Sequence, residues 1–246
     1  MTNLSSNILY EDEDTLAINK PAGLVVHSDG RTIETSVAEW FVSQYPEARD
    51  VGEPLKLEGR SGEPDVFIQR PGIVHRIDRE TSGVLLLAKT REGHAHLKSQ
   101  FQNREVEKIY HAFVYGVLES ERGVIDFQIG RKIGDFRKWS AEGDVRGQVR
   151  EALTEYLVLK KMSDEKASFV EARPKTGRTH QLRVHFKALG HPIVCDRLYA
   201  PHRQTILGFE RLALHARSIT FTNLKNEKIT IEALYPEDFK HALDMI

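Results

Sequence analysis

Apolar and polar residues alternate with a period of two in several short stretches of this chain, which predicts β-strands. The clearest stretch is 108–116, where aromatic and β-branched residues occupy most positions. Residues 83–90 form a continuous apolar run, typical of a strand that is buried on both faces. Further strands are expected at 8–10, 15–19, 123–129, 152–160, 168–172, 211–222 and 228–234.

Between these strands, apolar residues spaced by three or four positions predict a few helices. Each expected helix has a suitable residue at one or both ends, because short polar side chains favour helix starts and glycine or proline favours helix stops. The expected starts are Thr35 or Ser36, Thr90, Thr179 and Pro236, and the expected stops are Pro46 and Gly190.

Strands outnumber helices, and they do not alternate with them in a regular β-α-β rhythm. This pattern favours an α+β fold with a mixed, mainly antiparallel central sheet and flanking helices and loops, and it argues against a doubly wound sheet. The 246 residues are expected to form a single domain, 1–246. The stretch 47–71 is rich in glycine, proline and charge and is expected to be a long surface excursion.

The composition of the chain limits which partners and which cellular compartment are expected. The chain has 35 basic and 36 acidic residues, so affinity for a polyanion must come from local patches and not from a global field. The single cysteine, Cys195, excludes an internal disulfide framework and fits a reducing compartment, so a cytoplasmic location is expected. No window approaches 18 apolar residues and no signal peptide is recognisable, so no membrane association is expected.

The most informative segment places one acid, Asp78, between Arg76 and Arg79, just before the apolar run. An arginine within about 4–6 Å lowers a carboxyl pKa by roughly 1–3 units and keeps it ionised. An ionised aspartate suits a nucleophile or a base. From spacing alone, a buried acid neutralised within a structural network explains the segment equally well.

A second segment, 173–203, contains seven Lys or Arg residues and one acid, Asp196. A cluster of this sign is what phosphate contacts require. The helix expected to begin at Thr179 would bury one face and present His180, Arg183 and Lys187 on the other. A solvated basic face is the simpler explanation if this segment is taken alone.

The run 75–83, His-Arg-Ile-Asp-Arg-Glu-Thr-Ser-Gly, resembles the signature of the RluA-type RNA pseudouridine synthases, which isomerise uridines of large-subunit ribosomal RNA or transfer RNA. The segment 173–186 is similar to the second signature of this family. The resemblance extends from about Ile8 to the end of the sequence, and the small N-terminal S4 domain of many members is expected to be absent. It implies the pseudouridine synthase fold, an RNA partner, a monomer and no cofactor.

The resemblance also implies roles for individual residues. Asp78 corresponds to the nucleophile and Arg183 to the arginine that pairs with it. Tyr110 corresponds to a tyrosine that stacks on the target uracil, although periodicity alone makes it an ordinary strand aromatic. Arg76 corresponds to the arginine that fills the space left by the flipped base. Further RNA contacts are expected from Arg178, Thr179, His180 and Lys187.

Two further segments carry weaker expectations. Residues 19–23 are similar to the first motif of the family, in which the lysine and proline shape the floor of the site, and are expected to be structural. Residues 131–150 combine basic side chains with Phe136 and Trp139, a composition that can grip unpaired RNA but is also found in mobile surface loops.

The implied reaction begins with extrusion of the uridine at a cost of a few kcal/mol. Asp78 then assists cleavage of the bond between ribose C1′ and uracil N1, and uracil C5 attaches to C1′ instead. Covalent addition of Asp78 to C1′ and removal of the C2′ proton to give a glycal both remain open. No redox carrier, nucleotide or metal is needed, and ribosomal RNA is favoured over transfer RNA as the substrate.

Two other functions compete with this hypothesis. A metal-dependent hydrolase would use His180, His185 and His191, but the i+5 spacing of the first two differs from the i+4 spacing of helical zinc pairs. A non-catalytic RNA-binding module could keep the basic segments. It would have no use for an ionised Asp78 beside phosphates.

Overall fold

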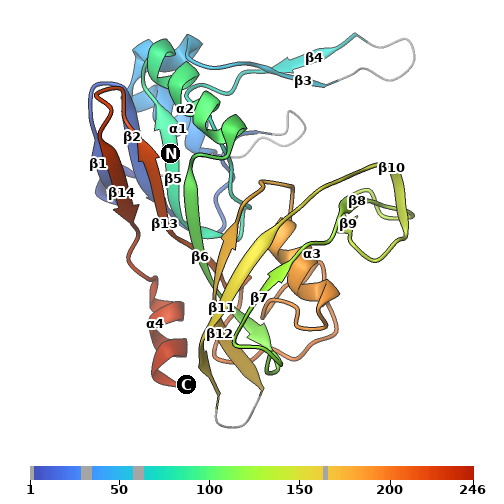
Figure 1. Cartoon of the computed structure of the whole chain (residues 1–246). Coiled ribbons are helices and arrows are strands. Elements are labelled where there is room, and N and C mark those ends of the chain that lie inside the picture. Colours follow the sequence, from blue (N-terminus) through green and yellow to red (C-terminus); the bar gives the residue numbers. More distant parts are fainter. Residues whose placement is uncertain (1–2, 29–34, 58–63, 163–165) are drawn as a thin grey trace. The chain divides into compact units, whose positions relative to one another are not determined.

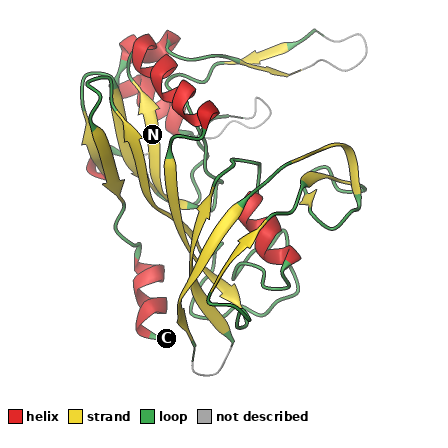
Figure 2. Ribbon diagram, viewed as in Figure 1, coloured by secondary structure: helices red, strands yellow, loops and turns green. Residues whose placement is uncertain are grey.

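The computed structural model describes residues 3–28, 35–57, 64–162 and 166–246. Strands outnumber helices, and the paired strands are mainly antiparallel, which confirms the predicted α+β class (Figures 1 and 2). The chain forms two compact units: unit 1 comprises 1–106 and 219–233, and unit 2 comprises 107–218 and 234–246. The single-domain organisation stays a prediction. No helix among the described residues is long and apolar enough to cross a membrane.

The sheet of unit 1 is built around a fully buried strand, β5 (Ser82–Ala88). This strand corresponds to the continuous apolar run of the sequence, and none of its seven residues is exposed. Its neighbours are β2 (Thr15–Lys20) and β13 (Leu214–Thr222), β1 (Ile8–Glu11) pairs with β2, and β14 (Lys228–Glu232) pairs with β13. Strand β13 starts in unit 2 and ends in unit 1.

Two helices of unit 1 begin at the expected residues. Helix α1 (Val37–Gln44) starts with a capping box, in which the Ser36 side chain accepts a hydrogen bond from Glu39 N–H and the Glu39 carboxylate accepts one from Ser36 N–H. Helix α2 (Arg91–Asn103) is capped by Thr90, whose hydroxyl oxygen accepts a bond of 3.0 Å from Gly93 N–H. Both caps confirm the sequence prediction.

The stretch 47–71 contains more regular structure than its composition indicates. It includes all but the first residue of the 3-10 helix η2 (Pro46–Asp50) and an antiparallel hairpin of β3 (Leu55–Leu57) and β4 (Val66–Ile68). Residues 58–63 lie outside the described part of the chain. A second 3-10 helix, η1 (Ser5–Asn7), precedes β1.

The main sheet of unit 2 is antiparallel and runs in the order β6, β12, β11, β7. Its strands are β6 (Glu107–Tyr115), β12 (Ala167–Pro174), β11 (Thr154–Lys161) and β7 (Arg122–Ile125). The core beside this sheet is aromatic. Buried phenylalanines at its centre are Phe113, Phe169, Phe186, Phe209 and Phe239.

The strand predicted at 123–129 is two strands, β7 and β8 (Ile129–Lys132). The backbone leaves the main sheet between them, and there the Phe127 carbonyl lies 3.1 Å from His185 Nε2. Strand β8 lies between β9 (Trp139–Ser140) and β10 (Val145–Arg150) in a separate three-stranded antiparallel sheet. Residues 131–150 are therefore a folded sheet and not an irregular loop.

Thr179 is not the N-cap of the basic helix, so that prediction is wrong. Helix α3 runs from Gln181 to Ala188, and its N-cap is His180, in the left-handed conformation with φ +56° and without a capping side-chain bond. The side chain of Gln181, the first residue of the helix, instead fixes the segment before it, because its Oε1 accepts a bond of 3.0 Å from Arg178 N–H. Thr179 precedes residues with the apolar spacing of a helix, a pattern typical of an N-cap, but it does not cap this helix.

The end of α3 agrees with the prediction. Gly190 has φ +84°, its N–H bonds to the Lys187 carbonyl at 2.9 Å, and the next N–H, of His191, bonds to the Phe186 carbonyl at 3.0 Å. This pair of bonds is a Schellman motif, which favours glycine at the left-handed position. The last helix, α4 (Glu237–Asp244), follows Pro236 as expected.

Candidate active site

Asp78 lies in a turn of unit 1 directly before β5. Its side chain is half-buried between the exposed Arg76 and Arg79, while Ile77 anchors the turn in the core with 5% exposure. The Asp78 carbonyl accepts a hydrogen bond of 3.1 Å from Thr81 N–H, which closes the turn. The carboxylate is therefore carried on a backbone that is fixed on both sides.

Lys20 holds this turn from the end of β2. Its side chain is fully buried, and its ammonium group donates to the carbonyls of Pro21, Leu24 and Arg79 at 2.8, 2.8 and 3.1 Å. The Arg79 carbonyl also accepts a bond of 2.8 Å from Gly23 N–H. A buried ammonium needs such partners because burial without them is costly. Residues 19–23 thus have the structural role expected of them.

His75 tethers the start of the same turn. Its Nε2 accepts a hydrogen bond of 2.8 Å from Leu86 N–H of β5, and its ring stacks on Phe101 of α2 with centroids 4.7 Å apart. An accepting Nε2 assigns the ring proton to Nδ1. The residues before and after Asp78 are consequently both attached to the framework of unit 1.

Arg76 has a second cation in its neighbourhood. Burial lowers the pKa of Arg70, and the positive charge of Arg76 adds to this lowering. Arg70 was not anticipated from the sequence, since it lies before the signature run.

Tyr110 belongs to β6 of unit 2, opposite Ala172 of β12, and packs at the margin of the aromatic core. Lys108 is two residues earlier on this strand and therefore on the same face. Burial lowers the pKa of Lys108. Lys108 was not among the residues predicted from the sequence, although the period of two around Tyr110 could have indicated it.

Arg183 forms a bidentate ion pair with Asp196. Its Nε lies 2.8 Å from Oδ2 and its Nη2 lies 2.8 Å from Oδ1 of this carboxylate. The Arg183 side chain is 11% exposed and that of Asp196 is fully buried, so this residue is not part of a solvated basic face. The guanidinium also lies over the ring of Tyr199, 5.0 Å from its centroid.

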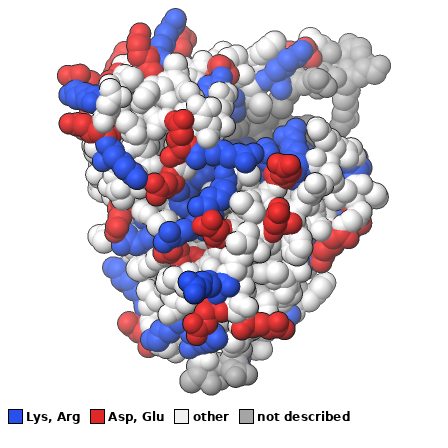
Figure 3. Space-filling view, viewed as in Figure 1, with Lys and Arg blue, Asp and Glu red and all other residues white. Residues whose placement is uncertain are grey.

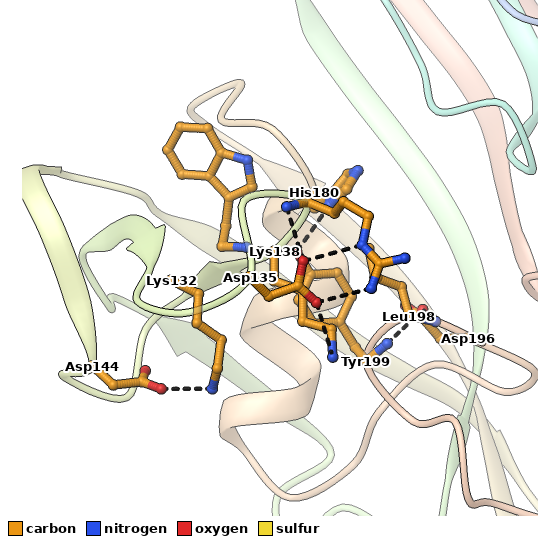
Figure 4. A network of polar contacts seen from close by, with 10 residues as sticks. Lys132, Asp135, Lys138, Asp144, His180, Asp196, Leu198 and Tyr199 are labelled. Atoms are coloured by element: carbon orange, nitrogen blue, oxygen red, sulfur yellow. Dashed lines mark hydrogen bonds and ion pairs between the residues drawn. The ribbon is translucent and has the colours of Figure 1, made fainter.

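Tyr199, which lies beside His180 (Figure 4), connects Arg183 to other parts of unit 2. Its hydroxyl lies 2.9 Å from Nδ1 of His180 and accepts a bond of 3.0 Å from Trp139 N–H of β9. His180 and Arg183 are thus brought together around one tyrosine. Asp196 was visible in the sequence only as the single acid of a basic segment.

The other expected RNA-contacting residues of unit 2 are placed separately. Arg178 donates to the Glu151 carbonyl at 3.0 Å, Lys187 forms an ion pair with Glu142, and Thr179 is exposed. Beside them, Lys132 pairs with Asp144 at 2.6 Å (Figure 4). Basic and acidic side chains are interspersed on the face in Figure 3, in keeping with the near-zero net charge.

A chain of buried polar side chains that was not predicted from the sequence fixes the start of α3. Thr176 donates to Gln181 Oε1 at 2.7 Å, and Gln181 Nε2 donates to Thr154 Oγ1 at 3.0 Å. His185 continues the chain, with Nδ1 at 3.0 Å from Thr154 Oγ1 and Nε2 at 3.1 Å from the Phe127 carbonyl. Burial lowers the pKa of His185. The network aligns the helix that carries Arg183.

The histidines considered as metal ligands have separate partners. His180 contacts Tyr199, His185 contacts Thr154 and Phe127, and His191 Nδ1 lies 2.8 Å from the Tyr115 carbonyl. Across the described ranges, no group of three or more His, Cys, Asp or Glu side chains is arranged to hold a metal ion. The geometry offers no support for the metal-dependent hydrolase.

Comparison with known proteins agrees with the signature at Asp78. A family model described as RNA pseudouridylate synthase matches residues 14–188. An RNA pseudouridine synthase of Aquifex aeolicus is 36% identical over 245 residues, which cover 97% of this chain and 72% of that protein. The dual-specificity RNA pseudouridine synthase RluA of Vibrio cholerae is 36% identical over 217 residues, 87% of this chain and 76% of that one.

Two further proteins extend the comparison. Ribosomal large subunit pseudouridine synthase D of Zymomonas mobilis is 33% identical over 246 residues, covering 97% of this chain and 72% of its own length. The structure of human RNA pseudouridylate synthase domain containing 4 has a TM-score of 0.74 at 27% identity and covers 98% of this chain and 93% of its own. The chain therefore belongs to the RluA-type RNA pseudouridine synthases, enzymes that isomerise uridine in RNA.

Proposed function

We propose that Asp78 is the residue that assists cleavage of the bond between ribose C1′ and uracil N1. The observation that carries this proposal is the fixed turn of unit 1 around a half-buried carboxylate. Hydrogen bonds from Lys20, Gly23 and Thr81 hold the Asp78 and Arg79 carbonyls, and His75 tethers the residues before Asp78. Fixed geometry is what a nucleophile needs, because reacting atoms must approach along one direction.

Three other residues complete the proposed machinery. Arg183 pairs with Asp78 and keeps its carboxylate anionic and oriented, since a planar guanidinium can bind two carboxylates along different edges. The ion pair with Asp196 occupies Nε and one hydrogen of Nη2, and the guanidinium carries five hydrogens in all. Tyr110 stacks on the uracil, and Arg76 fills the space that the flipped base leaves in the RNA.

The proposed reaction conserves every atom of the nucleotide. The bond between C1′ and N1 breaks with the assistance of Asp78, either by its addition to C1′ or by removal of the C2′ proton. The uracil turns in the site, its C5 bonds to C1′, and the C5 proton leaves while N1 gains a proton. Because the product is an isomer of the substrate, no cofactor is required.

For the substrate, we propose large-subunit ribosomal RNA ahead of transfer RNA, with Arg178, Thr179, His180 and Lys187 as further RNA contacts and a monomer as the active form. The Zymomonas relative bears the name of a large-subunit enzyme, whereas the Vibrio relative is called dual-specific. Both classes of RNA therefore belong in the test.

The experiment maps pseudouridine by carbodiimide labelling and primer extension in ribosomal and transfer RNA. It compares cells with the gene intact, deleted or replaced by Asp78→Asn. A site lost in both altered strains supports the proposal and names the substrate. The matched control is Glu92→Gln, which makes the same carboxylate-to-amide change at an exposed position of unit 1 and is expected to keep the site.

Purified Asp78→Asn protein is expected to bind the identified RNA with near-normal affinity and to show no turnover. Binding survives because phosphate and base contacts come from other side chains. Measurable turnover by a clean preparation of this variant contradicts the role of Asp78. Loss of binding together with turnover instead assigns Asp78 to RNA recognition.

A further inference from the structure

We infer that Asp196 is the positioning residue of Arg183, fixing the guanidinium in the one orientation that serves the reaction. This inference rests on the proposed role of Arg183. Asp196 touches neither the substrate nor the reacting atoms in this scheme. It acts through the two hydrogen bonds that hold the Arg183 fork.

The geometry of the pair restricts Arg183 strongly. Two parallel bonds of 2.8 Å, one from Nε and one from Nη2, define both the plane and the direction of the guanidinium. The Tyr199 ring, 5.0 Å from the guanidinium carbon, covers one face of that plane. An arginine otherwise has many rotamers, so these contacts remove freedom that would have to be lost during catalysis.

Asp196 is itself rigid. Its Oδ1 accepts bonds of 3.0 Å from Leu198 N–H and Tyr199 N–H, in addition to the one from Arg183 Nη2. The preceding residue, Cys195, has φ +58°, a left-handed conformation that reverses the chain at this point. The carboxylate is thus part of a tight turn. Its Oδ1 accepts the turn bonds, and its Oδ2 accepts the bond from Arg183 Nε.

Stability alone does not account for this arrangement. Burying an ion pair costs solvation of both charges, and an apolar pair of similar volume is often as stable or more so. The Asp196 side chain is fully buried, so its charge loses all of its contact with water when the pair forms. What the pair provides is a defined direction of the remaining guanidinium donors.

The different tasks of the two oxygens allow a selective test with Asp196→Asn. The amide oxygen can replace Oδ1 and keep the turn bonds to Leu198 and Tyr199. The amide NH₂ then replaces Oδ2 and faces the Nε–H of Arg183, so two donors oppose each other. The variant therefore disturbs the orientation of Arg183 while it preserves the local fold.

The chain contains a matched control. Arg211 and Asp238 of unit 2 form a second bidentate pair, with Nε to Oδ2 at 2.7 Å and Nη2 to Oδ1 at 3.0 Å, and Arg211 lies over the ring of Phe239 at 5.6 Å. Asp238→Asn makes the same chemical change in the same kind of contact. It is expected to leave turnover at the wild-type rate, since this pair has no proposed role in the reaction.

The measurement is the single-turnover rate at saturating RNA, with RNA affinity and thermal stability determined in parallel. Asp196→Asn is expected to lower the rate by about ten- to hundredfold, the effect of losing a hydrogen bond to a charged group, with affinity nearly unchanged. In an Arg183→Lys background the same substitution is expected to change the rate by no more than about twofold, because the fork it orients is gone.

A rate for Asp196→Asn within about twofold of wild type overturns the inference, as does a full effect in the Arg183→Lys background. A loss of rate equal to that of Asp238→Asn assigns the pair to general stability and also overturns it. Asp78→Asn in the same assay distinguishes failure of the proposed function from failure of the inference about Asp196. Turnover by Asp78→Asn contradicts the proposed role of Asp78, whatever Asp196→Asn does.

Discussion

His185 is a fully buried histidine whose two ring nitrogens both have partners, Thr154 Oγ1 and the Phe127 carbonyl. A carbonyl only accepts, so the proton lies on Nε2 and the neutral ring satisfies the site. Burial holds the pKa of His185 below its ordinary value of 6.5. The unfolded chain therefore binds a proton at a higher pH than the folded chain does.

This shift predicts a loss of stability in mild acid. The contribution of neutral His185 to the free energy of unfolding is complete above pH 6.5. It is lost as the pH falls from there toward the lower pKa of His185 in the folded chain. Urea unfolding at about pH 7.5 and about pH 5.5 should show a drop for the wild type and a smaller drop for His185→Gln, which has no titrating group. The exposed His202→Gln is the control and should behave as the wild type. Equal drops for His185→Gln and the wild type contradict the prediction.

Arg183→Lys tests whether the planar guanidinium group, with its two parallel hydrogen bonds, is required. A lysine ammonium cannot form two parallel bonds with Asp196 and cannot orient a second carboxylate at the same time. We expect the turnover of Arg183→Lys to be severely impaired. Arg211→Lys, in the second bidentate pair, should turn over normally, and near-normal rates from Arg183→Lys would remove the ion-pair role.

At the scale of elements, the Tyr199 hydroxyl attaches the three-stranded sheet of 129–150 to the Asp196 turn. Tyr199→Phe keeps the ring over Arg183 but leaves Trp139 N–H without its acceptor. We expect a loss of about 1 kcal/mol in the free energy of unfolding, the low end of the cost of an unsatisfied donor, because Trp139 is only half-buried. Amide exchange should accelerate at Trp139 and stay unchanged at Phe113 in β6. Unchanged exchange at Trp139 would mean that the sheet is held by other contacts.

The helix starts show what the sequence could and could not predict. Ser36 and Thr90 were recognisable because the capping oxygen is in the side chain of the boundary residue itself. The start of α3 was not, because its stabilising contacts join Gln181 to residues up to 28 positions away, as in the bond from Gln181 Nε2 to the Leu153 carbonyl. Local propensity cannot indicate a partner that only the tertiary fold supplies.

The same limit applies to the candidate site. Asp78 and Arg183 were identified from contiguous motifs, which are visible along the chain. Asp196 was counted only as a lone acid, since its contact with Arg183 depends on the left-handed turn at Cys195. A cysteine gives no sequence signal for such a turn, which glycine or asparagine usually occupies.

At the scale of the whole molecule, the core of unit 2 depends on Phe239 of α4. Its ring is fully buried, with centroids 5.5 Å from Phe113 and 5.2 Å from Phe209. Phe239→Ala is expected to lower the free energy of unfolding by about 3–5 kcal/mol through the cavity it leaves. Urea titration measures the loss, with Leu234→Ala as a control at a 76% exposed position. A loss below about 1 kcal/mol would show that the core collapses into the space.

Each unit is discontinuous in sequence, because 219–233 belongs to unit 1 and 234–246 to unit 2. Unit 1 needs Thr222, whose backbone bonds to Gln100 of α2, and unit 2 needs Phe239. Since a chain is synthesised from its N-terminus at about 5–20 residues per second, the core of unit 1 cannot be completed on the ribosome until 219–233 has emerged, and that of unit 2 must wait for 234–246. A ribosome that stalls near residue 218 would therefore present two incomplete cores at once to the cell's chaperones and proteases.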